Sequence, residues 1–184
     1  MAQAGTTTYP KHFAPSDPAA GSLKRSVTAG ALSGQIAGLI MAVVMMAVFT
    51  IFLGKNPLYP VQVIGSFIFG DAAIQGFHFS ALLAGLLLHQ LGPALFWGVL
   101  FGGAAHALRV SHGGKLLGLG AAIGLLSQII DVNLVLPVAM NALHGHNIWA
   151  EHVPSFWSWA AHLVFGLALA VYPWVYQRLG KRFA

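Results

Sequence analysis

Residues 27–53 read VTAGALSGQIAGLIMAVVMMAVFTIFL, a stretch without a single charged side chain. A helix needs about 20 mostly apolar residues to cross the hydrocarbon core of a bilayer. The stretch therefore predicts a transmembrane helix. Three further stretches meet the same requirement, at residues 79–108, 116–143 and 156–176. The sequence thus predicts four transmembrane helices.

The composition of the whole chain points the same way. Charged residues make up 7% of the 184 residues and hydrophobic residues 57%, whereas about 25% of a soluble domain is charged. A soluble domain of this size leaves roughly 30% of its chain surface in water and could not hide so much apolar surface. With no cysteine in the chain, disulfides and thiolate sites are also excluded. The expected fold class is all-α, an integral membrane four-helix bundle.

One apolar segment, residues 59–69, is too short to span. Pro57 precedes this segment and Pro60 is its second residue. We expect a short interfacial helix there. The predicted organisation is a polar N-terminal tail (1–26), a four-span domain (27–178) and a C-terminal tail (179–184).

The basic residues predict the orientation. Of the nine Lys and Arg residues, only Lys55 follows the first span on its far side. The others precede the first span, separate the second from the third or follow the fourth: Lys11, Lys24, Arg25, Arg109, Lys115, Arg178, Lys181 and Arg182. The positive-inside rule then predicts cytoplasmic termini. We expect a multi-pass protein of a bacterial inner (cytoplasmic or intracytoplasmic) membrane, in contact with lipid and not with nucleic acid.

The glycines predict close helix packing and a possible parallel repeat. Small residues four apart let two helix backbones approach closely in lipid, and the first and third spans carry such glycines: Gly30, Gly34, Gly38, Gly118 and Gly124. Each span that follows carries a histidine, His89 or His162, ahead of glycine and large apolar residues. Two similar halves in the same orientation would result. The glycines would pack within the chain or, alternatively, against another subunit.

Three of these segments resemble the YagU-like group of small uncharacterised bacterial inner-membrane proteins. They are the Gly-x3-Gly first helix ending in IMAVVMM, the proline-containing segment after it, and HLVFGLALAVY in the last helix. The resemblance covers about residues 30–176. It implies a fold of this kind and no particular chemistry.

Asp131 is the one charged residue deep within a predicted span, with Gln128 and Asn133 close to it in the sequence. A carboxylate at membrane depth costs at least about 2.5–3.5 kcal/mol, so it should face the bundle interior with a partner. His89 and His162 are the expected partners because they lie at similar depth. Such a polar cluster would be either structural or a proton relay.

Three histidines also fit the spacing of a tetrapyrrole site. A small residue precedes each by four positions, in the pairs Gly85/His89, Gly102/His106 and Ser158/His162. Haem b requires axial ligands on facing helices, which His89 and His162 would satisfy better than His106. Haem or (bacterio)chlorophyll is therefore one alternative ligand, and bound lipid is another.

The segment after the third span carries a candidate metal site. Its ligands would be His144, His146, His152 and Glu151, a set of the type that binds zinc or copper. The favoured alternative is a surface that docks onto a partner, because tryptophan and histidine are common in loops at the membrane interface.

The sequence contains no Walker motif, no Gly-x-Ser-x-Gly, no His-Glu-x-x-His and no lysine within a predicted span, and we do not expect an enzyme. The leading hypothesis is a non-catalytic accessory subunit of a larger, energy-transducing (respiratory or photosynthetic) membrane complex, which packs against partner subunits and positions them. The alternative is a small transporter or proton-relay protein that uses Asp131 with His89 and His162. A third hypothesis is a haem- or chlorophyll-binding membrane protein.

Overall fold

The structure, a computed structural model, describes residues 22–182, which form helices and no strand. Four helical stretches are long and apolar enough to cross a membrane: Leu23–Ile51, Phe79–Ala107, Gly113–His144 and Ser155–Gly180. The prediction of an all-α, four-span protein is confirmed. Most of the predicted N-terminal tail, residues 1–21, lies outside the described residues.

Only the first span is a single unbroken helix, α1 (Leu23–Ile51). Each of the others changes its winding partway along. The second span consists of α3 (Phe79–His89), η3 (Gln90–Ala94) and α4 (Leu95–Ala107). The third consists of α5 (Gly113–Ser127), η4 (Gln128–Val135) and α6 (Leu136–His144), and the fourth of α8 (Ser155–Ala168), η5 (Leu169–Val171) and α9 (Tyr172–Arg182).

Proline explains these breaks. Pro93 lies within η3, and Pro137 and Pro173 follow closely after η4 and η5. Proline has no N–H for the helical hydrogen bond and its ring clashes with the preceding turn. α1 contains no proline. In η3 and η4 the chain forms wide, π-helical turns, a common local adjustment to such a clash.

Two helix pairs cross at glycines, and they do so in the same way. A Cβ added to Gly98 of α4 would lie 2.6 Å from the Gly30 carbonyl oxygen and 2.8 Å from the Gly34 Cα of α1. A Cβ added to Gly166 of α8 would meet the Gly120 carbonyl and the Cα of Gly124 in α5, the latter at 3.0 Å. In both pairs backbone lies directly against backbone.

The matching contacts define the parallel repeat. Gly30 and Gly34 are the eighth and twelfth residues of α1, and Gly120 and Gly124 hold the same places in α5. The register differs from the predicted one on two counts. In the first half the carbonyl of Ala94 lies against Gly34, and in the second half the carbonyl of His162 lies against Gly124. Ala94 is therefore the counterpart of His162 in the repeat, and His89 is not.

Gly118 is the second difference. The sequence predicted a packing role for it, yet a Cβ added there would have no neighbour within 4 Å, and Gly120 makes the contact with α8 instead. Gly38 packs as predicted: a Cβ there would lie 2.8 Å from the Ala94 Cβ of η3.

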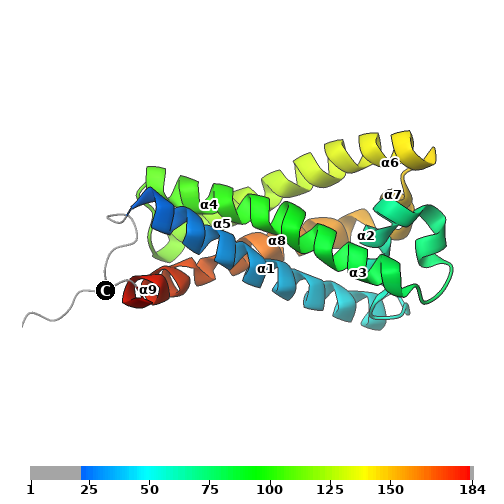
Figure 1. The fold of residues 1–184 in the computed structure, drawn as a ribbon, viewed down its shortest axis with the longest axis horizontal. Helices are drawn as coiled ribbons and strands as arrows, with labels where there is room; N and C mark the ends of the chain where they lie inside the picture. The colour runs from blue at the N-terminus through cyan, green and yellow to red at the C-terminus, as the bar shows by residue number, and fades with distance from the viewer. Residues whose placement is uncertain (1–21, 183–184) are drawn as a thin grey trace, which may run out of the picture.

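Short helices lie in the two connections at one end of the bundle, between the first and second spans and between the third and fourth. α2 (Tyr59–Phe69), followed by η2 (Gly70–Ile74), confirms the predicted short helix, and α7 (Ile148–His152) occupies the corresponding position in the second half. Figure 1 shows both at the end opposite α9. The Tyr59 hydroxyl and His152 Nδ1, 2.8 Å apart, join the two helices.

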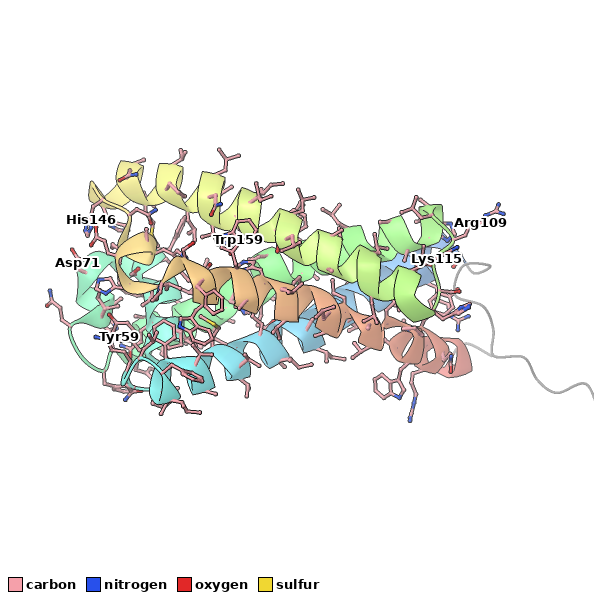
Figure 2. All side chains as sticks on the ribbon, turned by 180° about the vertical axis from the view of Figure 1, so that it is seen from behind. Tyr59, Asp71, Arg109, Lys115, His146 and Trp159 are labelled. Carbon is pink, nitrogen blue, oxygen red and sulfur yellow. The ribbon has the colours of Figure 1, made fainter. Side chains whose placement is uncertain are left out.

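The two ends of the bundle differ in charge. Arg109 and Lys115 lie at one end, whereas Asp71 and His146 lie at the other (Figure 2). Arg25 lies near the first end, where its guanidinium donates to the Tyr176 carbonyl at 2.7 Å and so ties α1 to α9. For convenience we call the end with Asp71 and His146 the outer end.

Candidate functional site: an intramembrane cavity

The third span diverges from the second toward the outer end. Figure 1 shows α6 leaving the bundle while α3 remains beside α2. The divergence leaves a cavity of about 540 Å³ between the two halves of the repeat. Its wall is mostly apolar and is contributed by every span and by both short outer helices; it includes Met41, Ala42, Val61, Ile64, Leu88, Val132, Met140 and Phe165.

Both π-helical breaks lie on this wall. Leu91 to Ala94 of η3 line the cavity, as do Asp131, Val132 and Val135 of η4. Irregular backbone at membrane depth persists where it is buried in protein or lines a cavity, because its polar groups need partners other than lipid. Gln35 of α1 supplies one such partner, donating from Nε2 to the Gln90 carbonyl at 2.8 Å.

Asp131 has a hydrogen-bond partner that the sequence did not predict. The Nε1–H of Trp97 on α4 donates to Asp131 Oδ2 at 2.6 Å. Trp97 is only 2% exposed and lines the same cavity. Among the side chains of residues 22–180, the ion pairs all involve His146, so no basic side chain of that range lies within 4.0 Å of the Asp131 carboxyl oxygens. The expected direct Asp–His contact is replaced by an Asp–Trp contact.

The two expected partners, His89 and His162, nevertheless lie on the same cavity wall. His162 Nδ1 is 2.9 Å from the Ser158 carbonyl oxygen. A carbonyl only accepts, so Nδ1 carries the proton of the neutral ring and Nε2 is left as an acceptor. The structure thus collects an acid and two imidazoles around one apolar space.

The remaining members of the predicted polar cluster form a separate chain of contacts. The Ser158 hydroxyl donates to Gln128 Oε1 at 2.8 Å, and Gln128 Nε2 donates to Asn133 Oδ1 at 3.3 Å. These bonds connect α8 with η4. Gln128 is buried, whereas Asn133 is exposed. The predicted cluster is therefore two groups, one on the cavity wall and one that bridges two helices.

The small residues of the tetrapyrrole motif are occupied by helix contacts. A Cβ at Gly85 would meet the backbone of α2, 2.9 Å from Gly65 N, and one at Gly102 would lie 3.0 Å from the Gly30 Cα. The room expected beside His89 and His106 is thus filled by neighbouring helices. His106 also lies outside the cavity lining.

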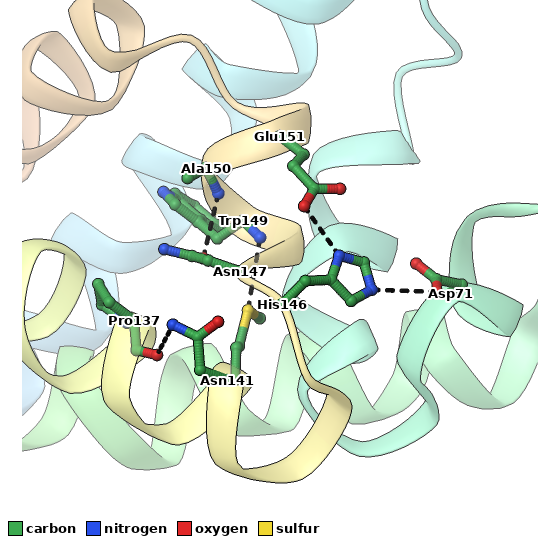
Figure 3. A network of polar contacts seen from close by, with 9 residues as sticks. Asp71, Pro137, Asn141, His146, Asn147, Trp149, Ala150 and Glu151 are labelled. Atoms are coloured by element: carbon green, nitrogen blue, oxygen red, sulfur yellow. Dashed lines mark hydrogen bonds and ion pairs between the residues drawn. The ribbon is translucent and has the colours of Figure 1, made fainter.

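A polar network joins the outer helices. His146 Nδ1 lies 2.8 Å from Glu151 Oε1 of α7, and its Nε2 lies 3.2 Å from Asp71 Oδ2 of η2 (Figure 3). A carboxylate only accepts, so both bonds form when the ring is protonated. The hydrogen bond to Glu151, followed by that to Asp71, raises the pKa of His146. When protonated, His146 links α7 to η2 at the outer end of the bundle (Figure 2).

The four predicted metal ligands do not meet at one point, and among them the structure gives a contact only between His146 and Glu151. His146 bonds to the two carboxylates, His152 faces the Tyr59 hydroxyl, and His144 Nε2 lies 3.1 Å from the Phe67 carbonyl oxygen. In the part of the chain that the structure describes, no group of three or more His, Asp or Glu side chains could hold a metal ion. These residues instead connect the third span and α7 to α2 and η2.

Three residues that shape the site were not predicted from the sequence: Trp97, Pro93 and Pro137. Trp97 was overlooked because it is 34 residues from Asp131 and only the fold brings them together. Pro93 and Pro137 carried a usable signal, since proline inside a predicted span marks a break.

Compared with known proteins, the chain matches no family model, no curated protein and no solved structure.

Proposed function

We propose that the protein is a small, non-catalytic membrane transporter that takes a lipid-soluble molecule into the cavity between its two halves. The observation that carries the proposal is the cavity of about 540 Å³ bounded by two broken helices. Its volume lies in the range of roughly 300–1,000 Å³ typical of small-molecule sites. Transporters commonly bind their substrate between structural repeats, where helices are discontinuous.

The cavity wall also supports entry from the bilayer. Leu86, Leu91 and Phe96 line the cavity and are 38%, 64% and 54% exposed on the apolar face of the second span. Val135 on the third span also lines the cavity and is exposed at the surface. Side chains that border both the cavity and the lipid-facing surface mark a lateral opening between α3–α4 and η4. A molecule dissolved in the bilayer would reach the cavity through that opening.

Filling the cavity tests the proposal. Ala42→Phe adds a phenyl ring inside the cavity, whereas Val43→Phe adds bulk one residue away on a side chain that is 63% exposed. Native mass spectrometry of the protein purified in mild detergent would compare the bound small molecules. We expect the wild type and Val43→Phe to carry a bound species that Ala42→Phe lacks. Equal occupancy in all three proteins, including none in any, would contradict the proposal.

We also propose that the membrane is a bacterial inner membrane and that both termini are cytoplasmic. The basic end of the bundle, with Lys24, Arg25 and Arg178, supports this orientation. Fusing a reporter that is active only in the cytoplasm to the C-terminus tests it. An inactive fusion would reverse the orientation.

The second candidate function is the accessory subunit of a larger complex. It is favoured by three exposed small residues at four-residue spacing on α5, Gly114, Gly118 and Ala122. Two glycines of this set would have no neighbour within 4 Å of an added Cβ, so this face is open to a helix of another subunit. Native gels of Gly118→Leu and wild type discriminate the candidates. A wild-type complex that the variant lacks would favour the accessory subunit, and a monomer in both would exclude it.

A further inference from the structure

The carboxyl of Asp131 has no ion-pair partner among the described side chains, and this indicates the kind of molecule that fits the cavity. Among the side chains of residues 22–180, Trp97 is its one hydrogen-bond donor, at 2.6 Å, and no basic side chain of that range lies within ion-pair distance. A carboxylate in apolar surroundings is costly unless a charge of opposite sign compensates it. The described side chains supply no such charge, so a proton or a cationic ligand can neutralise this carboxyl.

Aromatic rings surround the same space. Trp97, Trp149, Phe67, Phe96 and Phe165 all line the cavity. The faces of such rings attract organic cations, an interaction worth about 2 kcal/mol or more once water is excluded. Because the Trp97 indole also donates to Asp131, a ring and a carboxylate lie side by side. This combination of one anion and several aromatic faces suits a cation that carries its own apolar groups.

The other titratable groups on the wall are compatible with a cation. Three line the cavity, Asp131 from η4, His89 from α3 and His162 from α8, while α1, α2, α4, α5, α6 and α7 contribute apolar or neutral side chains. The neutral imidazole of His162 presents Nε2 as an acceptor. When neutral, neither histidine places a positive charge against the ligand.

We infer that the cavity takes a lipid-soluble organic cation, whose charge pairs with Asp131 and whose apolar groups lie against the aromatic wall. The inference rests on the proposed function and adds to it the substrate class. A lipid-soluble cation partitions into the bilayer and meets the lateral opening bordered by Leu91 and Phe96. A proton and the cation compete for the same carboxyl, so acidification weakens binding.

Calorimetric titration of the purified full chain tests the inference with tetraphenylphosphonium as the cation and triphenylphosphine oxide as a neutral probe of related shape. We expect saturable binding of the cation, weaker at lower pH, and little binding of the neutral probe. Asp131→Asn, which keeps an oxygen to accept from Trp97, should lower the affinity about tenfold or more, because it removes the paired charge. Asp131→Glu should retain binding, and Asp71→Asn, at the outer end, should leave it unchanged.

Each contrary result has its own meaning. Absence of saturable cation binding to the wild type, or equal binding by Asp131→Asn, overturns the inference. A neutral probe that binds the wild type as tightly as the cation also overturns it, and needs no variant. If the neutral probe binds and Ala42→Phe abolishes that binding, the proposed transporter stands with a neutral substrate. If neither probe binds and Ala42→Phe loses no co-purifying molecule, the proposed function fails as well.

Discussion

Replacing Gly98 by alanine adds a methyl group where α4 touches α1. The new Cβ would lie 2.6 Å from the Gly30 carbonyl oxygen and 2.8 Å from the Gly34 Cα, whereas ordinary van der Waals contact begins near 3.4 Å. Both neighbours are backbone atoms and cannot rotate away. The two helices must therefore separate locally by about 0.8 Å, the difference between 3.4 and 2.6 Å.

A gap of that size forfeits a quarter to a half of the attraction between the facing atoms. Overpacking of this kind typically costs about 1–3 kcal/mol. Gly103→Ala is the matched control, because it lies on the same helix and its added Cβ would have no neighbour within 4 Å. The control should be neutral or gain up to about 1 kcal/mol from the helix propensity of alanine.

Unfolding by sodium dodecyl sulfate in mixed micelles, followed by circular dichroism, measures the difference. We expect Gly98→Ala to be less stable than Gly103→Ala by about 1–3 kcal/mol. Gly166→Ala, at the equivalent crossing of α8 and α5, should be destabilised in the same direction. Equal stability of Gly98→Ala and Gly103→Ala would refute the close approach of α1 and α4.

Two further substitutions test other parts of the fold. The raised pKa of His146 means that its stabilisation is complete below the ordinary value near 6.5 and is lost as the pH rises through the folded-state pKa. Thermal unfolding should therefore show His146→Ala least stable relative to wild type at mildly acidic pH, with the two converging at alkaline pH; a gap independent of pH would contradict this. Gln35→Leu removes the side-chain donor to the Gln90 carbonyl, which keeps the backbone N–H of Leu95, and should cost about 0.5–1.5 kcal/mol in the micelle assay. Thr50→Val removes only an exposed bond within α1 and serves as its control, so similar losses in both would argue against a special role for Gln35.

Charge and hydropathy were sufficient to predict the four spans. Uncharged stretches of the required length are rare by chance in soluble proteins, so residues 27–53 alone were informative. The short helix at residues 59–69 was likewise predictable, because Pro60 near its start and its limited length allow little else. These features depend on the local sequence.

The register of the repeat was harder to predict. Glycines recur so often in the third span that Gly118 and Gly120 looked equally suited to packing. The choice depends on which face of α5 meets α8, and that face is set by the tertiary contact with Gly166. Matching His89 with His162 failed for the same reason, because the shared feature of the two return helices is the glycine crossing.

The cavity could not be deduced from the sequence at all. Its volume results from the divergence of α6, and the partner of Asp131 comes from another span. The sequence correctly indicated that Asp131 needs a hydrogen-bond partner. His89 and His162 were expected because they are the basic side chains at similar depth. Trp97 supplies an N–H donor instead of a base and brings no positive charge. Prolines within the spans were the signal that would have located the broken helices.

A structure with an anomalously scattering cation would locate the ligand. Crystals of the wild-type protein grown with tetraphenylarsonium would be measured at the arsenic absorption edge. We expect a single anomalous peak within the cavity, between Asp131 and the aromatic side chains of Trp97 and Phe165. A cavity without a peak, or peaks only on the lipid-facing surface, would contradict cation binding at Asp131.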